Sequence, residues 1–234
     1  EASDLAIGTF HSICVRILRR EIGHMGRSRG FVIYDDADSI GVIKQALKRE
    51  GMDPKVNDPK RIRWRIDQWK NAGILPAEAA SSAYDIDDEL SARFYGIYQR
   101  MLLDANALDF GDMIFGCYEV LKNNPSVLTQ VRNEFRHIFI DEYQDNNYAL
   151  NKVVNLIAEN NPSITVVGDE DQCIYSFRGA NYYNISDFRN RYKSHPNYAE
   201  IPLVENRRST QKILDLANAT ISQNPDRTPK NLKC

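Results

Sequence analysis

Apolar residues recur at three- and four-residue spacing through the first half of the chain, and this spacing is typical of amphipathic helices. It predicts helices over residues 11–25, 36–50, 59–72, 86–105, 109–122 and 126–135. A short apolar run ahead of the first helix, Leu5–Phe10, is typical of a strand. The stretch from 27 to 124 therefore reads as a set of successive helices with little strand character.

The second half alternates between short apolar runs and helical spacing. We expect strands at Ile138–Ile140, Ile164–Val167 and Ile201–Val204, and helices over residues 148–158, 179–192 and 209–223. Short strands of continuous apolar character, separated by helices, indicate a parallel sheet that is buried on both faces. The pattern predicts an α/β core interrupted by a helical insertion.

Composition narrows the partners that this fold can have. Hydrophobic residues make up 42% and charged residues 26% of the 234, which supports a packed core. The 30 Lys and Arg against 32 Asp and Glu leave a net charge of -2, so nucleic acid would be bound by local patches or stacking. The four cysteines form no CxxC pair, which suits a reducing, cytoplasmic setting. No apolar run approaches the roughly 18 residues of a membrane span, so we expect no membrane partner.

Two of the predicted strands end in carboxylates. The first runs straight into Asp141 and Glu142, and the second is followed by Gly168, Asp169 and, shortly after, Gln172. Ligands of open α/β sheets collect at such strand ends. A rigidly held Asp can bind Mg²⁺, and an adjacent Glu can orient or deprotonate an attacking water. A solvated acidic turn is the alternative for either strand end taken alone.

Basic and aromatic residues offer contacts to anions and bases. Arg207 and Arg208 follow the third predicted strand, where an arginine pair at a helix start indicates an anionic partner or an ordinary basic turn. Tyr175 and Phe177, with Arg178 beside them, can stack on unpaired bases or pack in the core. The run from Lys60 to Lys70 holds five basic residues and two tryptophans within about one helix, which suits either phosphate contacts or a solvated face.

Four segments together resemble the UvrD/PcrA/Rep-type superfamily 1 DNA helicases, over essentially the whole chain. They are Gly8–Ser12, Ile140–Asp145, Val167–Ala180 and Asn206–Thr210, and the third is long and highly specific. Their order and spacing agree with that family, and Ala107–Phe110 resembles its entry to the helix before the Mg²⁺ motif.

The resemblance implies a role for each matching residue. Asp141 would hold Mg²⁺, Glu142 would be the catalytic base, and Gln172 would sense the γ-phosphate of ATP. Arg208 would touch the γ-phosphate, and Arg207 stands where the family generally has a tyrosine that stacks on adenine. The path of single-stranded DNA would be lined by Thr9, His11, Tyr175, Phe177 and Arg178.

The resemblance also implies a fold and a division into domains. Residues 1–26 and 125–207 would form part of the first RecA-like motor core (1A), residues 27–124 the inserted helical subdomain (1B) that approaches duplex DNA, and residues 208–234 the start of the second core (2A). The parent protein would then be an ATP-dependent helicase that moves 3′ to 5′ on single-stranded DNA.

One departure from the family is large: no GxxxxGK[ST] phosphate-binding loop occurs in the chain. We therefore expect an internal fragment that is inactive alone, with a sheet edge left unpaired that favours self-association. Two other functions stay open. One is a non-enzymatic module that binds single-stranded nucleic acid, and the other is a two-metal phosphodiesterase that uses Asp141, Glu142, Asp145 and Asp169.

Overall fold

The structure is a computed structural model that describes residues 5–159, 163–224 and 227–234, except for the side chain of Arg178. Its contacts divide the chain into two compact units. The first consists of Glu1–Ile138 and Asn147–Thr165, and the second of Phe139–Asn146 and Val166–Cys234. Across the described ranges the chain is mostly helical, and its strands form two small two-stranded sheets. No helix within these ranges is both long and apolar enough to cross a membrane.

The chain enters the first unit through a capped helix and not through a strand. Helix α1 spans Phe10–Glu21, and the Thr9 side chain accepts a hydrogen bond from the backbone N–H of Ser12 at 3.3 Å. Leu5 is 63% exposed, and no described strand pairs with the segment before α1. The strand predicted at Leu5–Phe10 is therefore wrong, because the apolar run has no hydrogen-bonded neighbour and the threonine cap starts a helix at once.

Helices from both ends of the first unit share one apolar core. The 3-10 turn η2, Ile22–Met25, extends α1 and ends at Gly26, whose φ of 69° is readily adopted by glycine. The helices that pack with α1 are α6 (Phe110–Asn123), α7 (Pro125–Glu134) and α8 (Tyr148–Ala158). These helices agree with the predicted ranges within about two residues.

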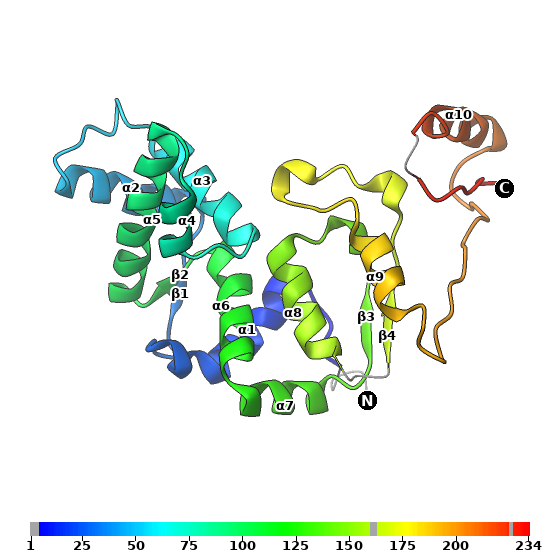
Figure 1. Ribbon diagram of the computed structural model, residues 1–234, viewed down its shortest axis with the longest axis horizontal. Coiled ribbons are helices and arrows are strands. Elements are labelled where there is room, and N and C mark those ends of the chain that lie inside the picture. The colour runs from blue at the N-terminus through cyan, green and yellow to red at the C-terminus, as the bar shows by residue number, and fades with distance from the viewer. Residues whose placement is uncertain (1–4, 160–162, 225–226) are drawn as a thin grey trace. The chain divides into compact units, whose positions relative to one another are not determined.

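Four further helices form a second core within the first unit (Figure 1). They are α2 (Asp36–Arg49), α3 (Pro59–Asn71), α4 (Pro76–Ser82) and α5 (Ile86–Asp104). A short parallel pair, β1 (Val32–Ile33) with β2 (Ala107–Leu108), joins the segments that enter and leave this group. Helix α4 and the two strands were not predicted, because a helix of seven residues and strands of two carry too little periodicity.

The second unit is built on the end of a parallel strand pair. Strand β3 (Ile138–Ile140) pairs with β4 (Ile164–Val166), and beyond it the Val167 N–H donates to Ile140 O at 2.7 Å while the Tyr143 N–H donates to Val167 O at 3.0 Å. The elements that follow are the 3-10 turns η3 (Tyr143–Asp145), η4 (Glu170–Gln172) and η5 (Ser176–Arg178), and the helices α9 (Asn184–Tyr192) and α10 (Gln211–Ile221).

The predicted sheet is smaller and more open than expected. Phe139 in β3 is 78% exposed, so the sheet is not buried on both faces. The strand predicted at Ile201–Val204 is also wrong: this segment is irregular, and Ile201 and Leu203 are 77% and 76% exposed. A continuous apolar run becomes a buried strand only where a ladder of hydrogen bonds to a neighbouring strand forms. Here the Lys233 N–H donates to Val204 O at 3.0 Å, beside an isolated bridge between Glu205 and Lys233, and the described segments form no longer ladder at this place.

The helix predicted over residues 179–192 is shorter than expected. It begins at Asn184, after η5 ends at Gly179 with a φ of 86°. The left-handed glycine stops the first turn, and a short irregular segment separates it from α9. This separation leaves the loop between η4 and α9 as a distinct feature of the second unit.

Candidate functional site

The two carboxylates that follow β3 lie on a strained turn. Asp141 and Glu142 are both exposed, and Asp141 Oδ1 accepts a hydrogen bond from the Glu142 backbone N–H at 3.0 Å. Glu142 has φ 50° and ψ 44°, the left-handed region that few residues other than glycine occupy. Its Oε2 accepts a hydrogen bond from Gln144 Nε2 at 2.8 Å. Strain of this kind collects at functional sites, and here it fixes the direction of the predicted catalytic base.

A buried glutamine joins the ends of the two strands. Gln144 is 1% exposed, and its Oε1 accepts a hydrogen bond from the Asp169 backbone N–H at 3.0 Å. Asp169 Oδ2 in turn accepts from Gln172 Nε2 at 2.8 Å. The close packing of the Gln144 side chain against the backbone at position 168 favours glycine there, because a Cβ would lie 2.7 Å from Gln144 Oε1. Glu142 and Gln172 thus belong to one hydrogen-bonded chain within the second unit.

Helix α9 packs against the turn that follows β3. Asn184, 2% exposed, donates from Nδ2 to the carbonyl oxygens of Tyr143, Gln144 and Asn146 at 3.4, 3.3 and 2.7 Å. The ring of Phe188, one turn along the helix, meets Tyr143 edge-on at 5.5 Å between centroids. Helix α9 therefore holds the backbone that directly follows Asp141 and Glu142. The residue pattern gave no signal of this support, since Asn184 sits in an unremarkable polar stretch.

A C-terminal segment binds the acidic turn η4. Arg227 holds Asp171 through two bonds, Nε to Oδ1 at 3.1 Å and Nη2 to Oδ2 at 2.7 Å. Lys230 Nζ forms ion pairs with Asp169 and, at 3.0 Å, with Asp171 Oδ2. The hydrogen bond from Arg227 is the main cause that lowers the pKa of Asp171 below its usual value. Part of the charge predicted to be free for metal or phosphate chemistry is therefore neutralised inside the chain.

The aromatic pair after η4 is accessible. Tyr175 and Phe177 are 37% and 64% exposed, and their ring centroids lie 5.9 Å apart at an interplanar angle of 58°. The core packing that spacing alone allowed for these rings does not occur. The side chain of Arg178 lies outside the described part of the chain.

The arginine pair makes contacts with residues next to it in the chain. Arg207 and Arg208 are exposed, and Arg207 Nε pairs with Glu205 Oε1 at 3.2 Å. Asn206 Oδ1 accepts from the backbone N–H of Arg208 at 3.0 Å. Among the described residues, no hydrogen bond or ion pair joins either arginine to Gln172. Within the described ranges, the contacts of the arginines are therefore with residues close by in the chain.

The remaining predicted residues, Thr9 and His11, belong to the first unit. Thr9 is exposed and serves as the cap of α1, and His11, two residues further on, is half-buried. The His11 ring meets Phe110 edge-on, with centroids 5.7 Å apart at 67°. Phe110 is 47% exposed at the first position of α6. It lies in the Ala107–Phe110 motif, yet sequence reasoning did not select it as a contact residue.

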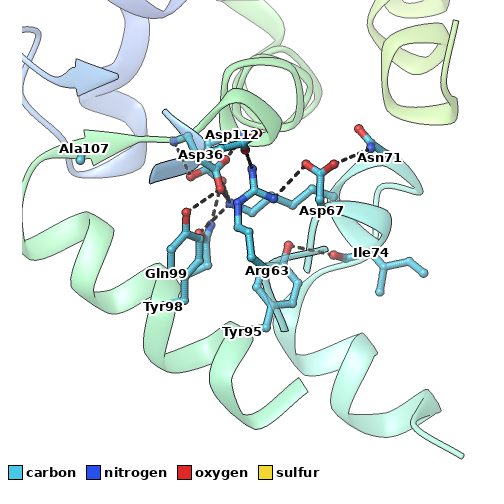
Figure 2. A network of polar contacts seen from close by, with 12 residues as sticks. Asp36, Arg63, Asp67, Asn71, Ile74, Tyr95, Tyr98, Gln99, Ala107 and Asp112 are labelled. Atoms are coloured by element: carbon cyan, nitrogen blue, oxygen red, sulfur yellow. Dashed lines mark hydrogen bonds and ion pairs between the residues drawn. The ribbon is translucent and has the colours of Figure 1, made fainter. Parts of the chain in front are cut away.

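The basic run on α3 is largely neutralised. Arg61 pairs with Asp87 at 2.5 Å, and Arg65 forms a two-bond pair with Asp88 at 2.6 and 2.5 Å. Figure 2 shows Arg63 between Asp36 and Asp67, at 3.4 and 3.3 Å. Trp69 and Lys70 are buried in the second core. This run is therefore mainly a set of helix contacts and not an open cationic patch.

The residues present fit a modest magnesium site. Within the described ranges, no group of three or more His, Cys, Asp or Glu residues is arranged to hold a metal ion by itself. Mg²⁺ commonly binds through one or two carboxylates, with waters and substrate phosphates as its other ligands. Asp141 is exposed and can supply such a carboxylate oxygen. Asp145, by contrast, has a buried Oδ1 with no hydrogen-bond partner, and burial raises its pKa.

Comparison with known proteins gives a consistent picture. The UvrD/REP helicase N-terminal domain matches residues 1–193. The chain is 43% identical over 231 residues to the ATP-dependent DNA helicase PcrA of Bacillus subtilis, covering 99% of this chain and 31% of that protein. It is 41% identical over 232 residues to PcrA of Staphylococcus aureus (strain Mu50), again with 99% and 31% coverage. The chain thus spans about a third of the length of these relatives, and it belongs to the UvrD/REP helicase family, to whose N-terminal domain it corresponds.

Proposed function

We propose that this chain is part of the motor of an ATP-dependent helicase that moves 3′ to 5′ on single-stranded DNA. One observation carries the proposal. The loop with the accessible pair Tyr175 and Phe177 begins just after Gln172, which is joined through Asp169 and Gln144 to Glu142. A change at the nucleotide can thus reach the base-stacking loop through three side-chain hydrogen bonds.

On the nucleotide side, each residue has one task in this proposal. Asp141 holds Mg²⁺, which neutralises phosphate charge when bound, and Glu142 takes the proton from the attacking water. Gln172 senses the γ-phosphate through its amide. Arg208 stabilises negative charge on the transferring phosphoryl group, and Arg207 offers its guanidinium plane to the base.

On the DNA side, Phe177 is the main stacking platform and Tyr175 supports it. Thr9, His11 and Arg178 complete the path, as the family resemblance implies. Phe110 joins this set because its ring is accessible and contacts His11. Base stacking suits a chain with a net charge of -2, since it does not depend on a large cationic surface.

The fold that goes with this function is the RecA-like one. We propose that β3 and β4 are two strands of its parallel sheet, with residues 1–26 and 125–207 in core 1A, 27–124 in subdomain 1B and 208–234 at the start of core 2A. Duplex DNA is then the partner of 1B. Self-association through the open edge of the β3–β4 sheet stays a prediction.

A module that binds single-stranded nucleic acid without hydrolysis is the second candidate. It is favoured by the accessible Tyr175 and Phe177 in a chain that holds no GxxxxGK[ST] loop. It needs the aromatic loop but neither Glu142 nor Gln172.

The test is a fluorescence titration of this 234-residue chain with a labelled oligothymidine of about 16 nucleotides. The Phe177→Ala variant should lose affinity by about 5- to 150-fold, because stacking contributes about 1–3 kcal/mol per base. Phe139→Ala is the matched control, since Phe139 is a still more exposed phenylalanine of the same unit, at 78% against 64%. It should bind as the parent chain does.

The outcomes separate the candidate functions. Binding that weakens equally in both variants, or no binding at low salt, would remove the aromatic loop as a DNA contact. Binding that responds to Mg²⁺ and ATP analogues, and loses this response in Gln172→Ala, supports the motor. Binding that ignores nucleotide in every variant agrees with both candidates, because the chain contains no GxxxxGK[ST] loop to hold a nucleotide.

A further inference from the structure

A fully buried lysine lies at the centre of a polar cluster in the first unit. Lys70, near the end of α3, is 0% exposed. Its Nζ lies 2.8 Å from Asp109 Oδ2, 2.7 Å from Asp112 Oδ1 and 3.0 Å from Gln99 Oε1. Figure 2 shows Gln99 on α5 near Asp112, to whose Oδ1 the Gln99 Nε2 donates at 2.9 Å. A single ammonium group therefore joins α3, α5 and the start of α6.

The charges in this cluster are strongly coupled. Burial alone would raise the pKa of Asp109, but Lys70 and then Arg63 outweigh it and hold this pKa at about 2. The Tyr98 hydroxyl donates to the same carboxylate, at 2.8 Å. Burial and the neighbouring Asp109 raise the pKa of Asp112. An ionised Asp109 inside the protein thus depends on Lys70, because a buried charge without a partner is very unfavourable.

The cluster also sets the start of helix α6. Asp109 is its N-cap, and Asp109 Oδ1 accepts from the Asp112 N–H at 2.8 Å. Lys70 packs so closely here that a Cβ on Gly111 would lie 2.8 Å from Lys70 Cδ. Phe110 lies between Asp109, which caps the helix, and Gly111, which packs against Lys70. Its backbone is therefore fixed by the residues on both sides of it. Its ring is left 47% exposed and in contact with His11.

We infer that Lys70 is a positioning residue for the nucleic-acid contact made by Phe110 and His11. The inference rests on the proposed function, since it takes these two rings as part of the single-stranded path. Lys70 itself is buried and can touch neither a base nor a phosphate. It acts by fixing Asp109, and through Asp109 the first residue of α6.

The first test needs no DNA. An aromatic ring shifts the NMR signals of protons near its edge or face, so the His11 ring protons report their distance from Phe110. In the 234-residue chain, Lys70→Met should move the His11 signals toward their position in Phe110→Leu, where the ring is missing. Lys44→Met is the matched control: Lys44 is an exposed lysine on α2, and its removal should leave the His11 signals unchanged. Signals of the core residue Ile17 check that each variant is folded.

The second test measures binding to the labelled oligothymidine well below the unfolding temperature. Lys70→Met should weaken binding by about tenfold, as for a partly lost stacking contact. The slope of log affinity against log salt should stay unchanged, because no phosphate contact is lost. A smaller slope would mean that Lys70 contacts phosphate directly, and would overturn the inference.

Further outcomes keep the inference falsifiable. If Lys70→Met does not fold, Lys70→Met/Asp109→Asn is used, because it removes both charges while asparagine still caps the helix. A folded variant with unmoved His11 signals and unchanged affinity overturns the role of Lys70 alone. If the parent chain binds no oligonucleotide, the proposed function and the DNA part of this inference fall together, while the NMR result still decides whether Lys70 sets the ring geometry.

Discussion

His11 is the residue whose titration reports most directly on the first unit. Burial lowers the pKa of His11 below its usual value near 6.5, and the nearby Asp67 carboxylate opposes this in part. We predict that NMR titration finds its midpoint below 6.5 and that Asp67→Asn lowers the midpoint further, because the opposing charge is removed. A midpoint at or above 6.5, or an increase in Asp67→Asn, would contradict the assigned environment.

The same shift sets the direction of a stability change. A histidine with a lowered pKa is neutral in the folded chain, so its contribution is fully present above about pH 6.5 and is lost as the pH falls through the folded-state pKa. Urea unfolding between pH 7 and pH 5 should show this loss. His11→Asn, which cannot titrate in this range, is the control and should show a smaller pH dependence.

Single residues also show where sequence reasoning reached its limit. Arg61 and Arg65 look available along the chain, yet their partners Asp87 and Asp88 lie more than twenty residues away on another helix. The residue type determines the charge of a side chain but not its ion-pair partner. The sequence therefore could not show that the basic residues of α3 are paired with carboxylates. The accessibility of Tyr175 and Phe177 could not be predicted either. Their spacing allowed both core packing and exposure, and only the fold shows that the rings are accessible.

Helices were predicted well because their signals are local. Helix α3 begins at Pro59 after the capping Asp58, and both residues stand next to each other in the sequence. Strands depend on a distant neighbour. In the described structure no strand pairs with Leu5–Phe10, and Ile201–Val204 meets a distant segment only at its end, where the Lys233 N–H donates to Val204 O. For the candidate site, the residues at the strand ends were foreseen, while the bridging role of Gln144 was not. A buried glutamine between two acidic strand ends has no signature in spacing alone.

Helix α9 acts as an element that holds the turn after β3, and Asn184 is the residue to test. Its amide donates to three backbone carbonyl oxygens, the nearest being Asn146 O at 2.7 Å, so Asn184→Ala should cost about 0.5–1.5 kcal/mol in free energy of unfolding through the lost hydrogen bonding. Asn184→Asp should cost more, because a carboxylate would face the same oxygens. Urea denaturation measures both variants.

The matched control lies on the same helix. Asn190 is exposed, and its side-chain oxygen accepts a hydrogen bond from Lys193 Nζ at 3.1 Å. Asn190→Ala should change the free energy of unfolding by no more than about 0.5 kcal/mol. Equal effects at the two positions would mean that α9 does not hold the turn through Asn184.

At the scale of the whole molecule, the residues of the proposed motor are divided between the two units. The second unit contains Glu142, Gln172 and the aromatic loop, and the first contains the His11–Phe110 contact with the Lys70 cluster behind it. Each unit therefore contains a buried polar residue that positions side chains of the proposed motor. In the second unit it is Gln144, and in the first it is Lys70. A substitution of Gln144 or of Lys70 should change the structure of its own unit and leave the other unit folded.

The sequence contains no phosphate-binding loop, and this predicts the ATPase activity of the 234-residue chain. In P-loop enzymes the backbone N–H groups and lysine of the GxxxxGK[ST] loop cradle the phosphates, and this chain contains no such loop. Glu142 and Gln172 then face a nucleotide that is not held, and positioning accounts for most of phosphoryl-transfer catalysis. We predict that the chain alone shows no ATP hydrolysis stimulated by single-stranded DNA above that of Glu142→Gln, purified in parallel. Hydrolysis that exceeds this variant and rises with DNA would mean that the chain binds phosphate by another route, because a contaminating ATPase would contribute equally to both samples.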